Sequence, residues 1–513
     1  MKSRVRPDRA RTHRPSTTMR RRSSRSIARC ASLAVLAVVA LATVPRARAH
    51  ESTMRARASR WIDDAVARGD VDLSDGVEPL PRTKRDDVVD GGARRLGLTT
   101  TRAPVETMEA YARVAWNATL HPSRYSPTEG LGAALASLRS SYGSDDKMAL
   151  IVCLLYERYE MGEASAFADY FRSGPEEFDT PSHWSDDTAK ELRGSDAYER
   201  DIVDEFKLLN TVSNALRMRV FDVYTDVFKS SAARTVPALR WAWTTAHARA
   251  TRVSGKEGLA LVPVLDMIRE CAPGAEAPDA AANGSDGDEG EEEEKTSFAV
   301  YDPHADQVVV YAKRDYGPGE ELCERLGDMN VAESLQHFGY VPDVAEESPR
   351  NCVLMVLEPK KKKFEKNLRD AGFQVPWRVC VPFAAREQSL DLLAAYIEVS
   401  HGRHVDVDEQ GLPQNVSRAS LREFLRERVD RYPTTLSEDE AALESMRQSV
   451  IDFADALERQ GMPVLEGARI EMKIRELRRS VSAVELRIRE KKILRRLLTR
   501  LDSAAPDERK DEL

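Results

Sequence analysis

The chain has 513 residues and a formal net charge of −8, and it is long enough for two or three domains with hydrophobic cores. Residues 1–49 hold thirteen Lys or Arg and one acid, Asp8, so residues 50–513 carry 64 basic and 84 acidic side chains, a net charge of −20. Because binding to nucleic acid requires a positive surface, this charge argues against a nucleic-acid partner and favours basic partners.

The first 49 residues have the pattern of a signal peptide and are set apart from the fold. A basic stretch precedes the mostly apolar residues 31–44, and Ala47-Arg48-Ala49 supplies the small residues of a signal-peptidase site. The apolar run is short for a membrane span, so no stable span is expected after cleavage. An uncleaved signal anchor and an organelle transit peptide are the alternatives, and a start at Met19 would give a signal of ordinary length.

The last four residues have the sequence of the retrieval signal of the endoplasmic reticulum: Lys510, Asp511, Glu512 and Leu513. Together with the signal pattern, they predict residence in the lumen of that organelle and a retrieval receptor as a partner. Three glycosylation sequons are compatible with this location, at Asn117, Asn283 and Asn415.

Five cysteines follow the signal segment: Cys153, Cys271, Cys323, Cys352 and Cys380. Because no two of them have a metal-ligand spacing, no metal site is predicted. Cys153 lies in an apolar helical pattern and is expected in the core. One or two disulfides fit an oxidising lumen, although the sequence does not determine their connectivity.

Hydrophobic periodicity predicts a mixture of helices and strands from residue 57 onward. A short helix is expected around Trp61, and longer helices over 146–228 and 235–253. Residues 297–301 and 307–312 read as the two strands of a β-hairpin. The segment between the last helix and the hairpin, residues 274–296, holds Ala, Gly and Pro and then a run of acids, which predicts a disordered loop.

Residues 345–503 are expected to be mostly helical. Ser437 and Glu440 have the spacing of a capping box in front of a helix whose apolar residues step by three and four. The last helix has its apolar residues on one face and basic residues toward another. The apolar face is formed by Ile493, Leu494, Leu497, Leu498 and Leu501.

Several segments occur in an order and spacing that is similar to a known family. They are Phe171–Trp184, Arg240–Arg249, Leu259–Ile268, Pro318–Gly327, Ala332–Asp343, and the pair Arg431–Glu440 and Arg489–Arg496. On these segments the chain resembles SET-domain proteins of the Rubisco large-subunit methyltransferase type, the class that includes the actin-histidine methyltransferase. The resemblance covers roughly residues 57–503.

The resemblance implies an α+β fold in which a SET β-fold is split by a helical insert and followed by a mostly α-helical C-terminal domain. The SET domain would occupy 50–344, with the insert at about 150–255. A helical domain like the Rubisco methyltransferase substrate-binding domain would occupy 345–503, followed by a tail over 504–513.

The resemblance also implies S-adenosylmethionine as the cofactor. It places Gly97, Leu98, Arg249, Asp266 and Met267 at cofactor-binding positions. Arg249 matches the arginine that contacts the cofactor carboxylate, since a guanidinium binds a carboxylate through two hydrogen bonds. The alternative for Arg249 is a solvated helix arginine, and His247, one turn earlier, is expected on the helix surface.

Several positions depart from the family pattern. Arg95 stands in place of a glycine, Arg269 and Glu270 in place of Asn and His, and Leu326 in place of the catalytic tyrosine. Asn330 and Val331 replace a Ser-Asn pair. A leucine can neither donate nor accept a hydrogen bond, so no catalytic residue is assigned, although Tyr316 or Tyr340 would serve after a shift of register.

Two functions therefore follow from the sequence. The first is an S-adenosylmethionine-dependent protein methyltransferase of the endoplasmic reticulum lumen, acting on lysine or histidine of a protein substrate. The second is a catalytically degenerate SET protein that keeps the fold as a protein-binding module.

Overall fold

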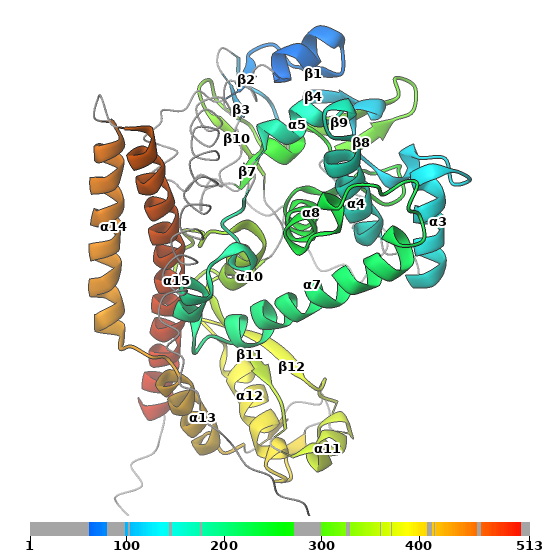
Figure 1. Cartoon of the computed structure of the whole chain (residues 1–513). Coiled ribbons are helices and arrows are strands. Elements are labelled where there is room, and N and C mark those ends of the chain that lie inside the picture. Colours follow the sequence, from blue (N-terminus) through cyan, green and yellow to red (C-terminus); the bar gives the residue numbers. More distant parts are fainter. Residues whose placement is uncertain are drawn as a thin grey trace, which may run out of the picture.

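A computed structural model describes most of the chain from residue 61 to residue 503 (Figure 1). The described residues are 61–79, 98–100, 103–142, 146–174, 177–270, 299–324, 329–359, 361–370, 372–407, 413–414, 416–458 and 463–503. The predicted acidic loop, the signal segment and the C-terminal tail lie outside these residues. In the described part, no helix is long and apolar enough to cross a membrane, and no group of acidic, His and Cys side chains is suited to a metal ion.

Two small sheets combine strands from before and after a long helical segment, as the predicted fold class requires. The first sheet has the order β1-β4-β9-β8, and all its pairs are antiparallel. The second has the order β2-β3-β10-β7, in which β10 and β7 run parallel. The strands are β1 (Val71–Leu73), β2 (Val77–Pro79), β3 (Leu98–Thr100), β4 (Ala110–Ala115), β7 (Arg269–Glu270), β8 (Ala299–Asp302), β9 (Gln307–Tyr311) and β10 (Glu321–Glu324).

The predicted hairpin is present as β8 and β9, whose paired residues run from Ala299 with Val310 to Asp302 with Gln307. Burial stabilises the pairing, because three consecutive valines of β9, Val308, Val309 and Val310, are buried. The turn ends at Asp306, which has a φ of 50°, a left-handed conformation that aspartate tolerates.

The inserted helices pack under the sheets and share their core. In α4, every residue from Ala149 to Leu155 is buried, so this helix is apolar on all sides and lies inside the fold. Cys153 is among these residues and is a free, buried thiol, which confirms the core prediction. The helices are α3 (Gly130–Tyr142), α4 (Asp146–Leu155), α5 (Ala168–Ser173), α6 (Asp186–Ala189), α7 (Val203–Leu216) and α8 (Val236–Arg249), followed by the short strands β5 (Thr251–Arg252) and β6 (Leu259–Ala260).

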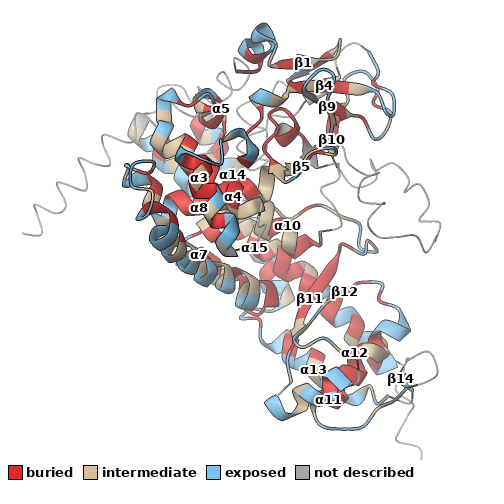
Figure 2. Ribbon diagram, turned by 90° about the vertical axis from the view of Figure 1, so that its right-hand side faces the viewer, coloured by how far each residue is buried: buried red, intermediate tan, exposed pale blue. Residues whose placement is uncertain are grey.

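The C-terminal part is built around the β11–β12 pair and the helices that cover it. Figure 2 shows its buried residues along β11 and along α12. A disulfide joins Cys352 to Cys380 across the pair, and Cys323 in β10 is also disulfide-bonded. The elements are α10 (Val331–Phe338), β11 (Cys352–Leu357), α11 (Glu365–Asp370), β12 (Trp377–Pro382), α12 (Glu387–Ser400), β13 (Asp406–Val407), β14 (Pro413–Gln414) and α13 (Ala419–Asp430).

Two long helices, α14 (Leu436–Glu458) and α15 (Val464–Ser503), run side by side along the left of Figure 1. The predicted apolar face of α15 is confirmed for four residues that are at most 2% exposed, Ile493, Leu494, Leu497 and Leu501. The predicted capping box is wrong by two residues. Thr435 caps α14, because its hydroxyl accepts from the Glu438 amide (3.2 Å) and its amide donates to the Glu438 carboxylate (2.7 Å).

Candidate functional site

Helix α8 presents three side chains to a small pocket from one of its faces. Thr235 caps the helix by accepting a hydrogen bond from the Ala238 amide (3.2 Å), and the helix ends at Arg249. Trp241, Thr245 and Arg249 are spaced by four residues and therefore lie on the same face. All three line the pocket.

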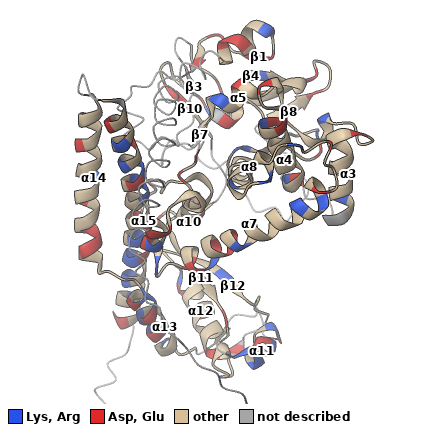
Figure 3. Cartoon of the chain, in the orientation of Figure 1, with Lys and Arg blue, Asp and Glu red and all other residues tan. Residues whose placement is uncertain are grey.

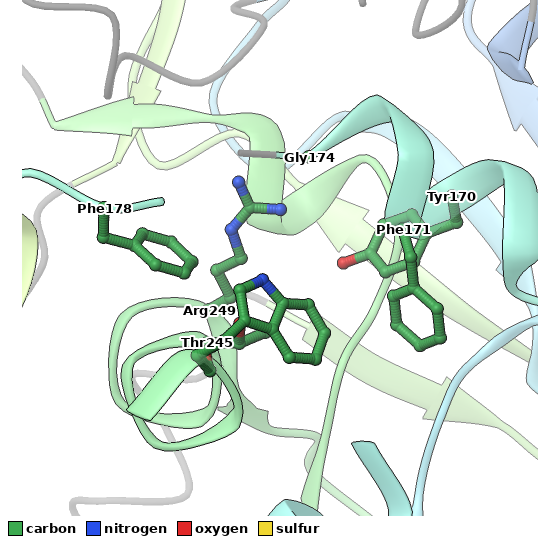
Figure 4. A pocket seen from close by; sticks show the side chains of 7 residues that line it. Tyr170, Phe171, Gly174, Phe178, Thr245 and Arg249 are labelled. Atoms are coloured by element: carbon green, nitrogen blue, oxygen red, sulfur yellow. The ribbon is translucent and has the colours of Figure 1, made fainter. Parts of the chain in front are cut away.

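Arg249 is nearly buried and lies against a glycine (Figure 4). Its side chain is 12% exposed, and its Nη1 atom lies 3.2 Å from Asp266 Oδ2. A Cβ atom at Gly174 would lie 3.2 Å from the same Nη1 atom, so a larger residue there would press on the guanidinium. Phe178 lies on another side, with its ring centre 5.9 Å from Arg249 Cζ. The position of Arg249 is thus fixed from several sides.

Asp266 lies on a short 3₁₀ helix that follows a strained residue. Val264, just before Leu265–Met267, has φ 76° and ψ −55°, and its side chain is fully buried. A β-branched residue rarely adopts a positive φ, because its side chain then crowds the backbone. Strain of this kind persists only where the surrounding structure imposes it, and it is concentrated at functional sites.

Tyr170 is the third residue of this site, beside Arg249 and Asp266. Its hydroxyl donates to Asp266 Oδ2 at 2.5 Å, and its ring lies 5.6 Å from that of Trp61. Burial and the neighbouring Asp266 carboxylate raise the pKa of Tyr170 well above its ordinary value, so this hydroxyl is a donor and not a base at neutral pH. The other carboxylate oxygen, Asp266 Oδ1, is buried and has no hydrogen-bond partner among the described residues.

The pocket is lined mainly by aromatic rings around one cation, and the free space in it is about 10 Å³. A volume of this order holds about one water-sized group, so a ligand would place only a small end group there. Its lining residues are Tyr170, Phe171, Gly174, Phe178, Trp241, Thr245 and Arg249. A guanidinium suits a carboxylate, and an unpartnered carboxylate oxygen suits a donor such as an ammonium group. Arg249 lines the pocket, whereas the fully buried Asp266 lies behind Arg249 and outside the lining.

The structure brings together two of the residues predicted from the sequence, Arg249 and Asp266. Met267 follows Asp266 in the same 3₁₀ helix. Leu98 begins β3, where it pairs with Leu322 of β10. Gly97 and Leu326 lie outside the described residues. The roles of Gly97, Leu98 and Met267 in cofactor binding stay predictions.

Tyr170 was missed because the matching segment was read from Phe171 onward. The signal was present in the preceding residue, since Tyr170 and Phe171 are adjacent aromatics just before a polar, Pro-containing stretch. In a helix, neighbouring residues point in different directions. Here Tyr170 faces Asp266, and the two rings remain 5.6 Å apart.

Other residues considered from the sequence have structural partners. The Tyr316 hydroxyl donates to the Cys323 carbonyl (2.7 Å) within the fold. Asn330 caps α10 by accepting from the Glu333 amide (3.0 Å). His247, expected on the surface, is half-buried and stacks on Trp243 and His337, with ring centres 4.5 and 5.9 Å away.

Among the predicted glycosylation sites, Asn117 is exposed, which a glycan would require. Asn283, Asn415 and the four residues Lys510, Asp511, Glu512 and Leu513 lie outside the described residues.

The C-terminal motifs meet in a buried polar group, here called the junction. Glu490 is fully buried, and its two oxygens accept from the hydroxyls of Ser195 and Tyr432, both at 2.8 Å. The next residue, Lys491, lies 2.6 Å from Asp439, which Arg487 also contacts at 2.6 Å. Asp196 and Arg428 form a further buried pair at 2.5 Å. The junction consists of Ser195, Asp196, Arg428, Tyr432, Asp439, Arg487, Glu490 and Lys491.

The junction joins the helical insert to the C-terminal part. Ser195 and Asp196 come from the insert, and the remaining members come from α13, α14, α15 and the connection before α14. Gly194 has a φ of 94°, and a Cβ atom there would lie 2.8 Å from the Tyr432 backbone. The paired motifs Arg431–Glu440 and Arg489–Arg496 therefore take part in a structural contact between the helical insert and the C-terminal part of the chain.

A family model described as "Rubisco LSMT substrate-binding" matches residues 412–494, which include α13, α14 and the junction part of α15. No curated protein matches the chain in sequence.

Solved structures match it in fold over most of its length. A SET domain of LSMT bound to lysine and AdoHcy has a TM-score of 0.58 at 17% identity, covering 87% of this chain and 91% of that one. Rubisco LSMT bound to sinefungin and monomethyllysine has a TM-score of 0.59 at 16% identity, covering 87% and 92%. Rubisco LSMT bound to AdoMet has a TM-score of 0.58 at 17% identity, with the same coverage.

Proposed function

Because the chain has the fold of the Rubisco LSMT type of SET protein and a match to its substrate-binding domain, we propose that it is an S-adenosylmethionine-dependent protein methyltransferase. The acceptor would be a nitrogen of a protein side chain, a lysine amine or a histidine imidazole. Solved structures with this fold contain lysine or monomethyllysine, which favours lysine.

The observation that carries the proposal is the pairing of Arg249 with a half-satisfied Asp266 beside the pocket. The methionine end of S-adenosylmethionine carries a carboxylate and an ammonium group. Arg249 would bind the carboxylate, and Asp266 Oδ1, which has no partner among the described residues, would accept from the ammonium. The residues present therefore fit this end of the cofactor.

When bound, S-adenosylmethionine supplies an activated methyl group on a positively charged sulfur. The protein must hold donor and acceptor in line and keep the acceptor nitrogen neutral. The aromatic lining formed by Phe171, Phe178 and Trp241 excludes water around the tail and strengthens the charge pairing of Arg249. Tyr170 keeps the Asp266 carboxylate oriented through its short hydrogen bond.

The second candidate, a SET protein that binds partners without catalysis, has an observation in its favour as well. Arg249 already contacts Asp266, so the charge of the guanidinium is partly compensated without any ligand. The free space in the pocket, about 10 Å³, is also small. Together with the substitutions at Arg269, Glu270 and Leu326, these features favour a binding module if the cofactor fails to bind.

The decisive experiment is titration calorimetry of S-adenosylmethionine into the purified chain, its Arg249→Ala variant and a matched control, Arg252→Ala. Arg252 is three residues away, but its side chain is 70% exposed. Micromolar binding, about −8 kcal/mol, that only Arg249→Ala weakens is the expected result. No heat at millimolar cofactor would contradict the methyltransferase proposal and support the binding module. Transfer of a radiolabelled methyl group to lysate proteins would then distinguish catalysis from cofactor binding alone.

The endoplasmic reticulum lumen is the proposed location. The predicted signal and retrieval sequences support it, and so do the Cys352–Cys380 disulfide, a second disulfide at Cys323 and the exposed sequon at Asn117. A retrieval receptor would then be one partner. The test is the expressed chain on a gel: loss of mass on glycosidase treatment, abolished by Asn117→Gln if that site is used. A chain with fully reduced thiols and no glycan would overturn the proposed location.

A further inference from the structure

One wall of the pocket is held in place from the C-terminal part of the chain. Phe178, which lines the pocket next to Arg249, belongs to the segment Glu177–Thr180, just after two positions outside the described residues, Pro175 and Glu176. Three parts of the chain contact this segment. Helix α15 and the C-terminal end of α10 are distant in sequence, and the Trp184 side chain follows a few residues later.

Arg479 of α15 makes the most extensive of these contacts. Its side chain is only 3% exposed, although it carries a full charge. Nη2 donates to the Phe178 carbonyl and to a Glu177 carboxylate oxygen, both at 3.1 Å, and Nε donates to Asp179 Oδ1 at 3.2 Å. Nη1 donates to Glu476 within α15, at 3.0 Å. One buried guanidinium thus binds three consecutive residues of the wall.

The other two contacts are made to the backbone of Asp179. Trp184 Nε1 donates to the Asp179 carbonyl at 2.7 Å. Gly339, the last cap of α10, has a φ of 79°, and a Cβ atom there would lie 2.5 Å from the Asp179 carbonyl carbon. The wall is therefore held both at its backbone and at its side chains, and α15 supplies the charged contacts.

We propose that Arg479 is a positioning residue through which the docking of α15 sets the wall of the Arg249 pocket, so that ligand binding and α15 docking are energetically coupled. The path is short. Arg479 bonds to the backbone of Phe178, and the Phe178 ring lies 5.9 Å from Arg249 Cζ. A shift of this wall by a fraction of an ångström changes the space beside the guanidinium. By reciprocity, a ligand in the pocket then stabilises the docked position of α15.

The position of Arg479 in the chain connects this coupling to the C-terminal helices. It lies within the segment matched by the substrate-binding family model, residues 412–494, yet its side chain points to the pocket wall. Figure 3 shows that Lys and Arg residues are frequent along α15. A protein partner that seats on the C-terminal helices would therefore influence the pocket through α15. This reading rests on the proposed function only in taking S-adenosylmethionine as the ligand.

The test compares Arg479→Lys with two controls in the full chain. Lysine keeps the charge but cannot bind three wall residues at once. Arg475→Ala removes a contact to the same Glu177 from the partly exposed side, without touching Phe178 or Asp179. Leu494→Ala creates a cavity in the distal, fully buried part of α15 and lowers stability without touching the wall. A purely structural role for Arg479 would make it behave like Leu494→Ala.

Two measurements decide the outcome. In calorimetry, Arg479→Lys should bind S-adenosylmethionine about tenfold more weakly, while both controls stay within about twofold of the unaltered chain. In hydrogen exchange, residues 177–184 should exchange faster in Arg479→Lys than in either control. Unchanged affinity in Arg479→Lys would overturn the proposal. If the unaltered chain binds no cofactor, the methyltransferase proposal fails, and exchange alone decides this one: unchanged exchange at 177–184 would overturn it.

Discussion

The pocket at Arg249 and the junction around Glu490 are both buried and charged, but they differ in how completely their carboxylates are bonded. In the junction, each oxygen of Glu490, Asp439 and Asp196 has a partner. In the pocket, Asp266 bonds through one oxygen only, and the other is buried without a partner among the described residues.

The two regions also differ in backbone conformation. The approach to Asp266 passes through a strained valine at Val264, whereas the junction is carried by regular helices and a glycine at the one position with a positive φ, Gly194. A buried cluster whose carboxylates are fully bonded specifies how two parts of a chain meet. An incompletely bonded carboxylate beside a pocket is less common and calls for an explanation. The contrast fits a structural role for the junction and agrees with the proposed ligand-binding role of the pocket.

The largest expected effect comes from removing the central carboxylate of the junction. Asp439→Ala leaves Lys491 and Arg487 buried without their counter-charge, and breaking such a pair typically costs about 3–5 kcal/mol. Burial alone would raise the pKa of Asp439, but hydrogen bonds from Lys491, Thr434 and Arg487 hold it below its usual value. Urea denaturation should show the loss. Glu440→Ala, which removes a half-exposed partner of Lys492, serves as the control and should leave the midpoint nearly unchanged.

A second effect in the junction depends on pH. Burial raises the pKa of Glu490 from 4.5 to about 7, despite hydrogen bonds from Ser195 and Tyr432 and the nearby Arg428. The folded chain thus keeps a proton that the unfolded chain releases between these two values. The contribution of Glu490 is therefore fully present below pH 4.5 and is lost as pH rises toward about 7, by about 3 kcal/mol at most.

Glu490→Gln tests this sign, because glutamine is neutral at every pH. Its free energy of unfolding should fall less than that of the unaltered chain between about pH 5 and pH 7.5. Glu444→Gln, at an exposed position of α14, is the matched control. Equal slopes for Glu490→Gln and the unaltered chain would show that Glu490 titrates normally and is not enclosed by the junction.

An intermediate effect is expected in the pocket. Tyr170→Phe keeps the ring against Trp61 but removes the hydroxyl that donates to Asp266. A hydrogen bond to a charged group contributes about 1.5–3 kcal/mol, so thermal unfolding should occur at a lower temperature. Tyr301→Phe removes a similar bond to Asp306 (2.6 Å) on the exposed hairpin and should have little effect. Equal decreases in unfolding temperature for the two variants would show that the buried hydrogen bond of Tyr170 contributes no more to stability than the exposed one of Tyr301.

The sequence was sufficient for the parts of the fold that depend on periodicity. The β8–β9 hairpin follows from β-branched residues on both sides of turn residues, and the buried thiol of Cys153 and the apolar face of α15 follow from helical spacing of apolar residues. The combination of Arg249 with Asp266 came from the ordered motifs. Tyr170 lies next to one of these motifs, but its contact with Asp266 and that of Arg479 with Asp179 join residues 96 and 300 positions apart. The sequence shows that such residues exist, and only the fold shows what they touch.

The start of α14 shows the same limit on a smaller scale and supplies the smallest predicted effect. The sequence spacing favoured Ser437 as the cap, but the backbone turns two residues earlier and makes Thr435 the cap, with Glu438 completing the box.

Thr435→Ala should lower the free energy of unfolding by about 1 kcal/mol, the usual effect of losing a cap. Ser437→Ala, already inside the helix and exposed, should leave stability unchanged or raise it slightly, since alanine has the higher helix propensity. Chemical denaturation of both variants ranks the two sites. A larger loss of unfolding free energy in Ser437→Ala than in Thr435→Ala would show that Ser437 is the cap, as the sequence favoured. It would also place the first turn of α14, which holds Asp439 in the junction, in a different register.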